Sequence, residues 1–287
     1  MQQSSPLALQ GIEFVEYATT QPLALGAFLQ RAGFTPIARH RSREVMLYRQ
    51  GDMNVIVNAA PDAPFNAAAA VGSTHVGAVA FRVQNAAAAH KAAMSMGAWD
   101  VPGRAREMEL NIPAIRGPGD SEFYFVDRAG DFSIYDVDFV PLPGAETAEN
   151  SRFDHHFFGI VQLVLPERVA AWEDFYASLF GFTTIPAGQF FGVVNKGELM
   201  QSPCKTFMWQ IIEPPSDGMD VEWDEALVRI GIGTPDVAKT KAAWEANGIS
   251  FLPVAQKADG AIRGAVTEIT AGGACLELVL STSKEHN

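Results

Sequence analysis

One acidic residue, Glu277, stands among apolar neighbours in the stretch 271–280, AGGACLELVL, which is typical of a buried strand. A carboxylate removed from water costs several kcal/mol unless a metal ion, an arginine or a network of hydrogen-bond donors meets it. The partner of Glu277 therefore decides whether this chain can carry a metal-dependent reaction.

Composition limits the classes of protein to consider. The 287 residues are 48% hydrophobic, which is enough for two domains with cores of their own. A formal net charge of −12 argues against a nucleic-acid or anionic-membrane partner, since either needs basic patches. Cys204 and Cys275 lie in apolar runs and are expected to be reduced core thiols. No run reaches the roughly eighteen apolar residues of a membrane span, and residues 1–6 do not resemble a signal peptide, so we expect a cytoplasmic protein.

The order of predicted elements repeats once along the chain. Strands with one buried face are followed by helices that end at a glycine, and the same order of strands and helices starts again after residue 154. Three pairs of segments correspond, at offsets of 148, 151 and 141 residues: 28–34 with 176–182, 90–97 with 241–248, and 133–138 with 274–279. A period this long predicts two duplicated domains.

We therefore predict an α+β fold of two tandem domains. Each domain pairs two strand–helix–strands modules in a curved mixed sheet around a pocket, with helices outside. The Pro-rich and acidic composition after residue 140 places the boundary. The predicted parts are a lead-in 1–10, an N-terminal domain 11–144, a linker 145–153 and a C-terminal domain 154–287.

Four stretches of the N-terminal half closely resemble the 4-hydroxyphenylpyruvate dioxygenase family of the vicinal oxygen chelate superfamily: GIEFVEYA (11–18), HRSREVMLYRQG (40–51), MELNIPAIRG (108–117) and SIYDVDF (133–139). The resemblance covers about residues 9–144 and implies paired βαβββ modules. It also implies that the N-terminal domain is structural and metal-free. The positions equivalent to metal ligands there hold Phe14, Ala78 and Asp136, and two of these cannot bind a metal. We therefore expect the ligand pocket in the C-terminal domain.

The resemblance implies Fe(II) as the cofactor, held by two histidines and one glutamate with positions left open for a 2-oxo acid and O₂. Glu277 matches the family's glutamate. Arg229 holds the place of the second histidine, and its protonated guanidinium has no lone pair to offer a metal. This predicts an Arg229–Glu277 ion pair in the space that a metal would fill. The alternative is a strand register shifted by one, with Arg229 facing solvent.

Two positions compete for the first histidine. The segment FDHH (153–156) resembles the family's Ile-Asp-His motif and nominates His155 as a metal ligand beside Glu277. Counting back from the following helix without a gap nominates Gly159 instead. Residues 155, 157 and 159 would share one strand face, whereas His156 would face the other way.

The remaining family site positions are also changed. Gln210 and Trp209 lie on the strand that supplies substrate contacts, and Gln210 is also a candidate catalytic residue or weak metal ligand. Glu268 and Thr270 replace a glutamine and a phenylalanine, as candidates for proton transfer and substrate binding. Six residues follow Ser281, so we expect no counterpart of the family's closing C-terminal helix. Self-association as a homo-oligomer would cover the open side.

Three hypotheses follow for an aromatic 2-oxo acid or similar small carboxylate. In the first, a divergent dioxygenase holds Fe(II) through His155, Glu277 and a further ligand such as Gln210. In the second, a metal-independent protein holds the carboxylate at Arg229, with His155 or Glu268 moving protons. In the third, the chain is a non-catalytic binding or partner module.

Overall fold

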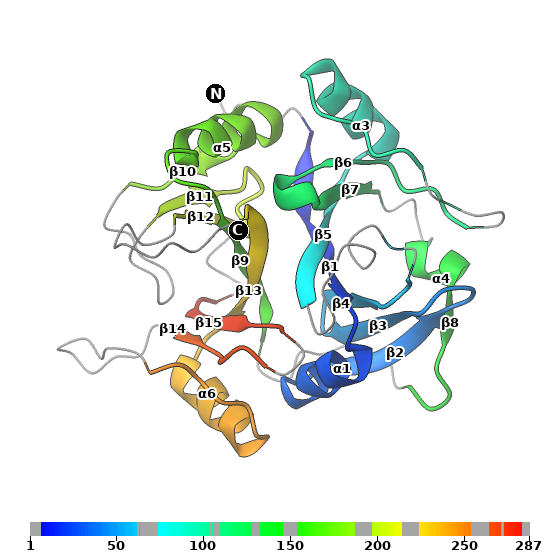
Figure 1. The fold of residues 1–287 in the computed structure, drawn as a ribbon, viewed down its shortest axis with the longest axis vertical. Coiled ribbons are helices and arrows are strands. Elements are labelled where there is room, and N and C mark those ends of the chain that lie inside the picture. The colour runs from blue at the N-terminus through cyan, green and yellow to red at the C-terminus, as the bar shows by residue number, and fades with distance from the viewer. Residues whose placement is uncertain are drawn as a thin grey trace.

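A computed structural model of the chain describes residues 7–61, 63, 74–103, 105, 109–127, 133–145, 154–186, 197–213, 224–253, 264–270 and 273–282. Figure 1 shows two halves joined through a central sheet, with the N-terminal half in blue to green and the C-terminal half in light green to red. The helices α1, α3, α5 and α6 lie on the outside of this arrangement. Within the described residues, no helix has both the length and the apolar character that crossing a membrane requires.

The elements of the N-terminal half are β1 (Leu9–Thr19), α1 (Pro22–Arg31), β2 (Thr35–His40), β3 (Val45–Gln50), β4 (Met53–Asn58), β5 (Thr74–Val83), α3 (Ala86–Ser95), β6 (Ala114–Arg116), the 3-10 turn η1 (Pro118–Asp120), β7 (Glu122–Val126), α4 (Ile134–Asp138) and β8 (Phe139–Pro141). Strand β1 pairs parallel with β4 and antiparallel with β5, which in turn pairs parallel with β7. These pairings form the two modules of one domain.

The elements of the C-terminal half are β9 (His156–Leu163), α5 (Val169–Phe175), the π-helical turn η2 (Tyr176–Phe180), β10 (Thr183–Thr184), β11 (Glu198–Gln201), β12 (Met208–Ile212), β13 (Ala226–Thr234), α6 (Val237–Ala246), β14 (Gly264–Val266) and β15 (Leu276–Leu280). Strand β9 pairs parallel with β12 and antiparallel with β13, which pairs parallel with β15. The pairing scheme of the first half is therefore repeated, as the sequence predicts. Residues 146–153 of the predicted linker lie outside the described residues.

The two halves share one sheet and one core. Strand β13 meets β5 where Leu227 lies opposite Val76, and the described strands form the continuous order β10-β11-β12-β9-β13-β5-β1-β4-β3-β2-β8. The ring of Phe81 lies 5.2 Å from that of Phe180, and the ring of Phe123 lies 5.6 Å from that of Trp209. Aromatic side chains of both halves thus pack into a single apolar cluster, which fixes one half against the other.

Each half also has a second, smaller cluster on the opposite face of its sheet. Side chains alternate along a strand, so one face of the sheet joins the shared core and the other lines the inside of its own half. In the N-terminal half the inner cluster includes Phe14, Leu47 and Ile56. In the C-terminal half it includes Phe158 and Met208. These inner faces are where a ligand site would lie.

The segment 133–138, which the repeat predicts to be a strand like 274–279, is not one, because residues Ile134–Asp138 form the helix α4. The Ser133 hydroxyl accepts a hydrogen bond from the backbone N–H of Tyr135, and the Arg41 guanidinium donates to the Val137 carbonyl at 2.7 Å. Side chains therefore form hydrogen bonds with backbone groups at both ends of this short helix. The proposed correspondence of 133–138 with 274–279 fails for the same reason, since the second segment contains strand β15.

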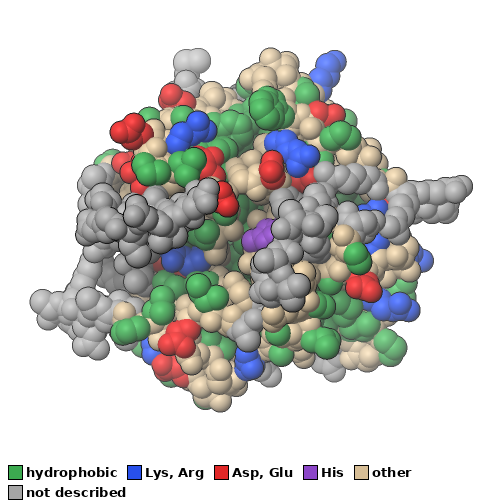
Figure 2. Space-filling model, viewed as in Figure 1, with side chains coloured by type: hydrophobic (Ala, Val, Ile, Leu, Met, Phe, Trp, Pro, Cys, Tyr) green, Lys and Arg blue, Asp and Glu red, His purple; other side chains and the backbone are tan. Residues whose placement is uncertain are grey.

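The face of the molecule in Figure 2 carries acidic, basic and hydrophobic side chains interspersed. The coloured side chains on that face do not gather into one continuous basic patch.

Candidate functional site

Arg229 and Glu277 form the ion pair that the sequence predicts. Strands β13 and β15 run parallel with Gly231 opposite Glu277, so Arg229 lies two residues earlier on the neighbouring strand and on the same face. Its Nε lies 3.3 Å from the Glu277 Oε2, and the side chains are 15% and 3% exposed. A cation therefore meets the buried carboxylate.

The Arg229 guanidinium is incompletely hydrogen-bonded. Its Nε and Nη2 are buried and have no hydrogen-bond partner among the described residues, although the Nε lies within ion-pair distance of Glu277. An arginine presents five N–H donors in a planar fork that suits a carboxylate held by two bonds. Arg229 consequently keeps donor capacity beyond its contact with Glu277.

The inner space beside this pair is small. A cavity of about 20 Å³ lies between Gly159, Gly231, Gln210 and Glu277. A space of this size holds about one water molecule. A Cβ at Gly159 would lie 2.4 Å from the backbone carbonyl oxygen of Met208 on β12, closer than Cβ contacts occur. Position 159 therefore has no room for a histidine in this arrangement.

His155 lies elsewhere, directly before β9 and between the two halves. Its Nδ1 lies 3.3 Å from the Gln50 Oε1, and its Nε2 lies 3.4 Å from the Thr240 Oγ1. The ring meets Trp244 edge-on, and burial is the main cause that lowers the pKa of His155 to about 4. The structure thus does not bring His155 to Glu277 as a second metal ligand, because both its nitrogens face polar partners of the core.

The other predicted site residues do not lie together in one site. Gln210 lines the small cavity with Glu277. Trp209, next to it on β12, faces the shared core, where it is fully buried and its Nε1 donates to the Gln162 Oε1 at 2.9 Å. A substrate contact through Trp209 does not fit this placement. Glu268 is exposed and Thr270 is half-buried, and neither lines the small cavity, so the proposed proton transfer and substrate contact find no support there.

The donor set does not fit Fe(II). Across the described part of the chain, no three His, Cys, Asp or Glu side chains come together as a metal-holding group. At the inner face of the C-terminal half, the residues around Glu277 are an arginine, two glycines and a glutamine amide. An iron site of the two-histidine, one-carboxylate type needs imidazole nitrogens that these positions do not supply.

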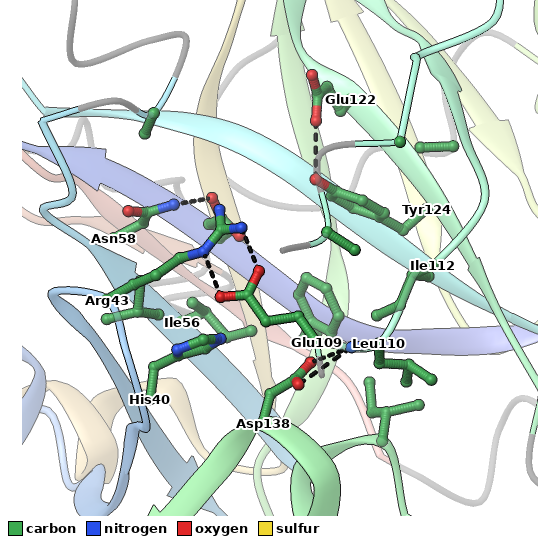
Figure 3. Close-up of a pocket in the computed structure, with 18 of the residues that line it drawn as sticks. His40, Arg43, Ile56, Asn58, Glu109, Leu110, Ile112, Glu122, Tyr124 and Asp138 are labelled. Atoms are coloured by element: carbon green, nitrogen blue, oxygen red, sulfur yellow. Dashed lines mark hydrogen bonds and ion pairs between the residues drawn. The ribbon is translucent and has the colours of Figure 1, made fainter. Parts of the chain in front are cut away.

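A larger cavity, of about 230 Å³, lies on the inner face of the N-terminal half, whereas the sequence predicts the pocket in the C-terminal half. Figure 3 shows Arg43 and Glu109 facing one another inside it. The Arg43 Nε donates to the Glu109 Oε1 at 3.0 Å, and Asn58 donates to the Glu16 Oε1 at 2.9 Å. This half of the molecule thus has more room for a ligand than the described part of the C-terminal half.

The strand equivalent to β15 in the N-terminal half, β7, also carries a buried carboxylate, that of Glu122. Glu122 lies opposite Ala78 in the parallel pair of β5 and β7, and Glu277 lies opposite Gly231 in the pair of β13 and β15. The Tyr124 hydroxyl donates to the Glu122 Oε2 at 2.8 Å, and the Arg116 Nη1 lies 3.7 Å from its Oε1. The sequence equated Asp136 with Glu277, but Asp136 is exposed on α4.

Comparison with known proteins gives the family. The family described as "Hydroxyphenylpyruvate dioxygenase, HPPD, N-terminal" matches residues 3–140. The chain is 33% identical to a 4-hydroxyphenylpyruvate dioxygenase of Pseudomonas aeruginosa over 88% of this chain and 74% of that protein. The chain belongs to the 4-hydroxyphenylpyruvate dioxygenase family. It is also 35% identical to hemolysin VllY of Vibrio vulnificus, over 87% of this chain and 73% of that protein.

The fold of this family is a vicinal oxygen chelate fold, and the structure agrees with it. A solved xylose isomerase-like TIM barrel/4-hydroxyphenylpyruvate dioxygenase fusion protein superposes with a TM-score of 0.75 at 24% identity, over 97% of this chain and 50% of that chain. The names of these relatives differ, so family membership leaves the reaction of this member open.

Proposed function

We propose that this chain is a metal-independent member of the 4-hydroxyphenylpyruvate dioxygenase family that binds a small carboxylate, in the first instance an aromatic 2-oxo acid, at Arg229. The observation that carries the proposal is the ion pair of Arg229 with Glu277, Nε to Oε2 at 3.3 Å. A fixed guanidinium next to the family's glutamate supplies the positive charge that a metal ion would otherwise bring.

The unpartnered nitrogens of Arg229 support a carboxylate as the ligand. Nε and Nη2 are buried without hydrogen-bond partners among the described residues, and burying such donors costs about 1–3 kcal/mol each. A ligand carboxylate would satisfy both in one bidentate contact. The side chain is 15% exposed as a whole while its Nε and Nη2 are buried, so a bound carboxylate requires the residues around these nitrogens to shift.

The Gln210 amide lines the small cavity together with Glu277. An amide N–H suits the carbonyl oxygen that a 2-oxo acid presents next to its carboxylate. Nothing in the described donor set supplies an open metal position for O₂, so the family's oxidative decarboxylation is not part of this proposal.

The test combines metal analysis with ligand titration. Protein incubated with Fe(II) and desalted should hold far less than one metal per chain by mass spectrometry and should not turn over 4-hydroxyphenylpyruvate. Metal-free protein should bind 4-hydroxyphenylpyruvate or phenylpyruvate in calorimetric titration. The Arg229→Gln variant should bind at least about tenfold more weakly, since a charged hydrogen bond is worth about 1.5–3 kcal/mol.

The control variant is Arg168→Gln, which removes a half-exposed arginine paired with Glu225 away from the site. It should bind like the unmodified protein. Stoichiometric iron that is lost on Glu277→Ala, accompanied by turnover, would overturn the proposal. Binding of either acid that Arg229→Gln leaves unchanged would remove Arg229 as the anchor.

A further inference from the structure

We propose that His155 is a pH-sensitive link between the two halves, and that acid releases helix α6 from the N-terminal half while the rest of the chain stays folded. His155 directly precedes β9 and contacts both halves, with Gln50 at the end of β3 on one side and Thr240 on α6 on the other. The inference goes beyond the proposed function, because it concerns other residues and a change in the protein that needs no ligand.

The partner of the ring in the N-terminal half is held in one orientation. The Gln50 side chain is buried, and its Nε2 donates to the Ala32 carbonyl at 3.4 Å. Gly33 leaves room for this amide, since a Cβ there would lie 2.4 Å from the Gln50 Nε2. The Gln50 Oε1 therefore faces the Nδ1 of His155 as an acceptor, at 3.3 Å.

The partner of the ring in the C-terminal half belongs to a pair of buried hydroxyls. The Thr240 Oγ1 lies 3.4 Å from the Nε2 of His155 and 2.8 Å from the Thr234 Oγ1. Both threonines are 1% exposed, and Trp244 on the same helix meets the His155 ring edge-on. Since these neighbours are shielded from solvent, a positive charge on His155 would lose most of its hydration.

The surroundings of His155 favour the neutral ring. Burial is the main cause that lowers the pKa of His155 to about 4, and His156 lowers it further, whereas Asp154 raises it. The elements that surround the link carry further charged groups: Arg31 on α1, Arg49 on β3, Asp236 at the start of α6, and Lys239, Lys241 and Glu245 on α6. The link is therefore complete above about pH 6.5, the ordinary pKa of histidine, and weakens as pH falls toward 4.

Helix α6 lies on the outside of the molecule, beside α1 (Figure 1). Its buried residues are Val237, Thr240 and Trp244. Just after its last turn, the Asn247 Nδ2 donates to the Arg31 carbonyl of α1 at 3.0 Å, in an exposed contact. Elements that bury few side chains open at a lower free energy than the core of the same protein. Loss of the His155 contact should thus release α6 before the shared core opens.

The test is hydrogen–deuterium exchange of the full chain, read by mass spectrometry at pH 7 and pH 4.5 and corrected for the intrinsic exchange rate. Peptides from α6 are compared with peptides from β4, which lies between β1 and β3 in the sheet. Exchange in α6 should accelerate at least about tenfold between these pH values and should be faster than in β4 at both. Equal protection of α6 and β4 at both pH values would show that the chain opens only as a whole, and would overturn the proposal.

Two variants assign the effect to the ring. His155→Gln keeps a polar side chain but cannot titrate, so its α6 exchange should change less than about threefold over the same range. Asn247→Ala is the matched variant, because it removes the contact with Arg31 without removing a titratable group. It should accelerate α6 exchange at both pH values and keep the tenfold change. A tenfold change that persists in His155→Gln would assign the pH dependence to another group and refute the link.

His156→Gln controls for the neighbouring histidine, whose Nε2 lies 3.1 Å from the Ser281 Oγ. It should keep the acceleration in α6, and loss of the acceleration there would make His156 the titrating group and refute the inference. If His155→Gln does not fold, the NMR signal of the His155 ring in the unmodified chain decides. It should titrate over the pH range in which α6 exchange accelerates, and a ring that titrates near pH 6.5 while α6 stays protected would contradict the link. The proposed function is tested separately, because its readout is the binding of a 2-oxo acid.

Discussion

Glu122 and Glu277 are buried carboxylates on equivalent strands of the two halves, Glu122 opposite Ala78 and Glu277 opposite Gly231 on the neighbouring parallel strands. Both residues are 2% exposed. Each has a guanidinium within ion-pair distance, the Arg116 Nη1 at 3.7 Å from the Glu122 Oε1 and the Arg229 Nε at 3.3 Å from the Glu277 Oε2, and Glu122 also accepts the Tyr124 hydroxyl. A cation therefore meets the buried carboxylate of this strand in both halves.

The first prediction concerns the ion pair. Glu277→Leu should destabilise the chain by about 3 kcal/mol, because it leaves the largely buried charge of Arg229 without its partner. The double variant Arg229→Met, Glu277→Leu should recover most of that loss, since apolar side chains of similar volume often replace a buried pair without cost. Urea unfolding of the two single variants and the double variant measures the coupling.

A double variant as unstable as Glu277→Leu would contradict this view of the pair. In that case Arg229 and Glu277 would stabilise the local structure through contacts other than the attraction between their opposite charges.

The second prediction uses two glycines on adjacent strands. Gly159→Ala should destabilise by about 2 kcal/mol, because its Cβ would come within 2.4 Å of the Met208 carbonyl oxygen and force the strands apart. Gly231→Ala is the matched control. Its Cβ would find no atom closer than 3.5 Å, so its stability should stay within about 1 kcal/mol of the unmodified protein. Thermal and urea unfolding compare them.

If Gly159→Ala and Gly231→Ala changed the stability equally, position 159 would have more room for a side chain than its distance from the Met208 carbonyl allows. A histidine could then be accommodated there, and the argument against a metal ligand at this position would fail.

Much of the fold follows from local sequence signals. The helix ends at Gly33 and Gly181 each precede a phenylalanine that enters the shared core, and this repeated pattern correctly aligned the two halves. The prediction of a strand for residues 133–138 was wrong, although Ile134 and Val137 favour a strand by their residue type. The Ser133-x-x-Asp136 spacing is a helix-start signal that would have corrected the prediction.

The site was only partly predictable. Arg229 and Glu277 could be paired because one acidic residue in an apolar strand demands a counter-charge. Glu122 stands in a similar run, EFYFV, and the same reasoning would have found it. The N-terminal cavity depends on how β1, β3, β4 and β7 curve together, and no local pattern specifies an unfilled space. His155 was misplaced because it precedes β9 and follows Asp154, whose φ is 52°, so its side chain does not follow the alternation of that strand.

The third prediction separates Trp209 from its neighbour Gln210. Trp209→Phe should destabilise by about 1–2 kcal/mol, since it leaves Gln162 without the indole donor and reduces core packing. It should not change the affinity for a 2-oxo acid. Gln210→Ala should do the reverse, with little effect on stability and a weaker affinity. Urea unfolding gives the stability of each variant, and calorimetric titration gives its affinity for the 2-oxo acid.

A loss of ligand affinity in Trp209→Phe that exceeds its effect on folding would return this residue to the binding site. The alternation of side chains along β12 makes that outcome incompatible with the described register.

The fourth prediction concerns the pH dependence of folding. The pKa of His155 is lowered to about 4 in the folded chain, chiefly by burial, against about 6.5 when unfolded. The unfolded state therefore binds more protons between these values. Stability from this group is fully present above about pH 6.5 and is lost as pH falls toward 4, by about 3 kcal/mol in total.

The neutral ring is also what its neighbours require. The Gln50 Oε1 can only accept, so Nδ1 carries the proton and Nε2 is left to accept from the Thr240 hydroxyl. Protonation would turn Nε2 into a donor and oblige that hydroxyl to reorient within a core that is closed to water. His155→Gln cannot titrate, so its unfolding free energy should change less between pH 6.5 and 4 than that of the unmodified protein. The carboxylates common to both proteins cancel in this difference, and parallel pH profiles from urea unfolding would show that the ring is not buried in its neutral form.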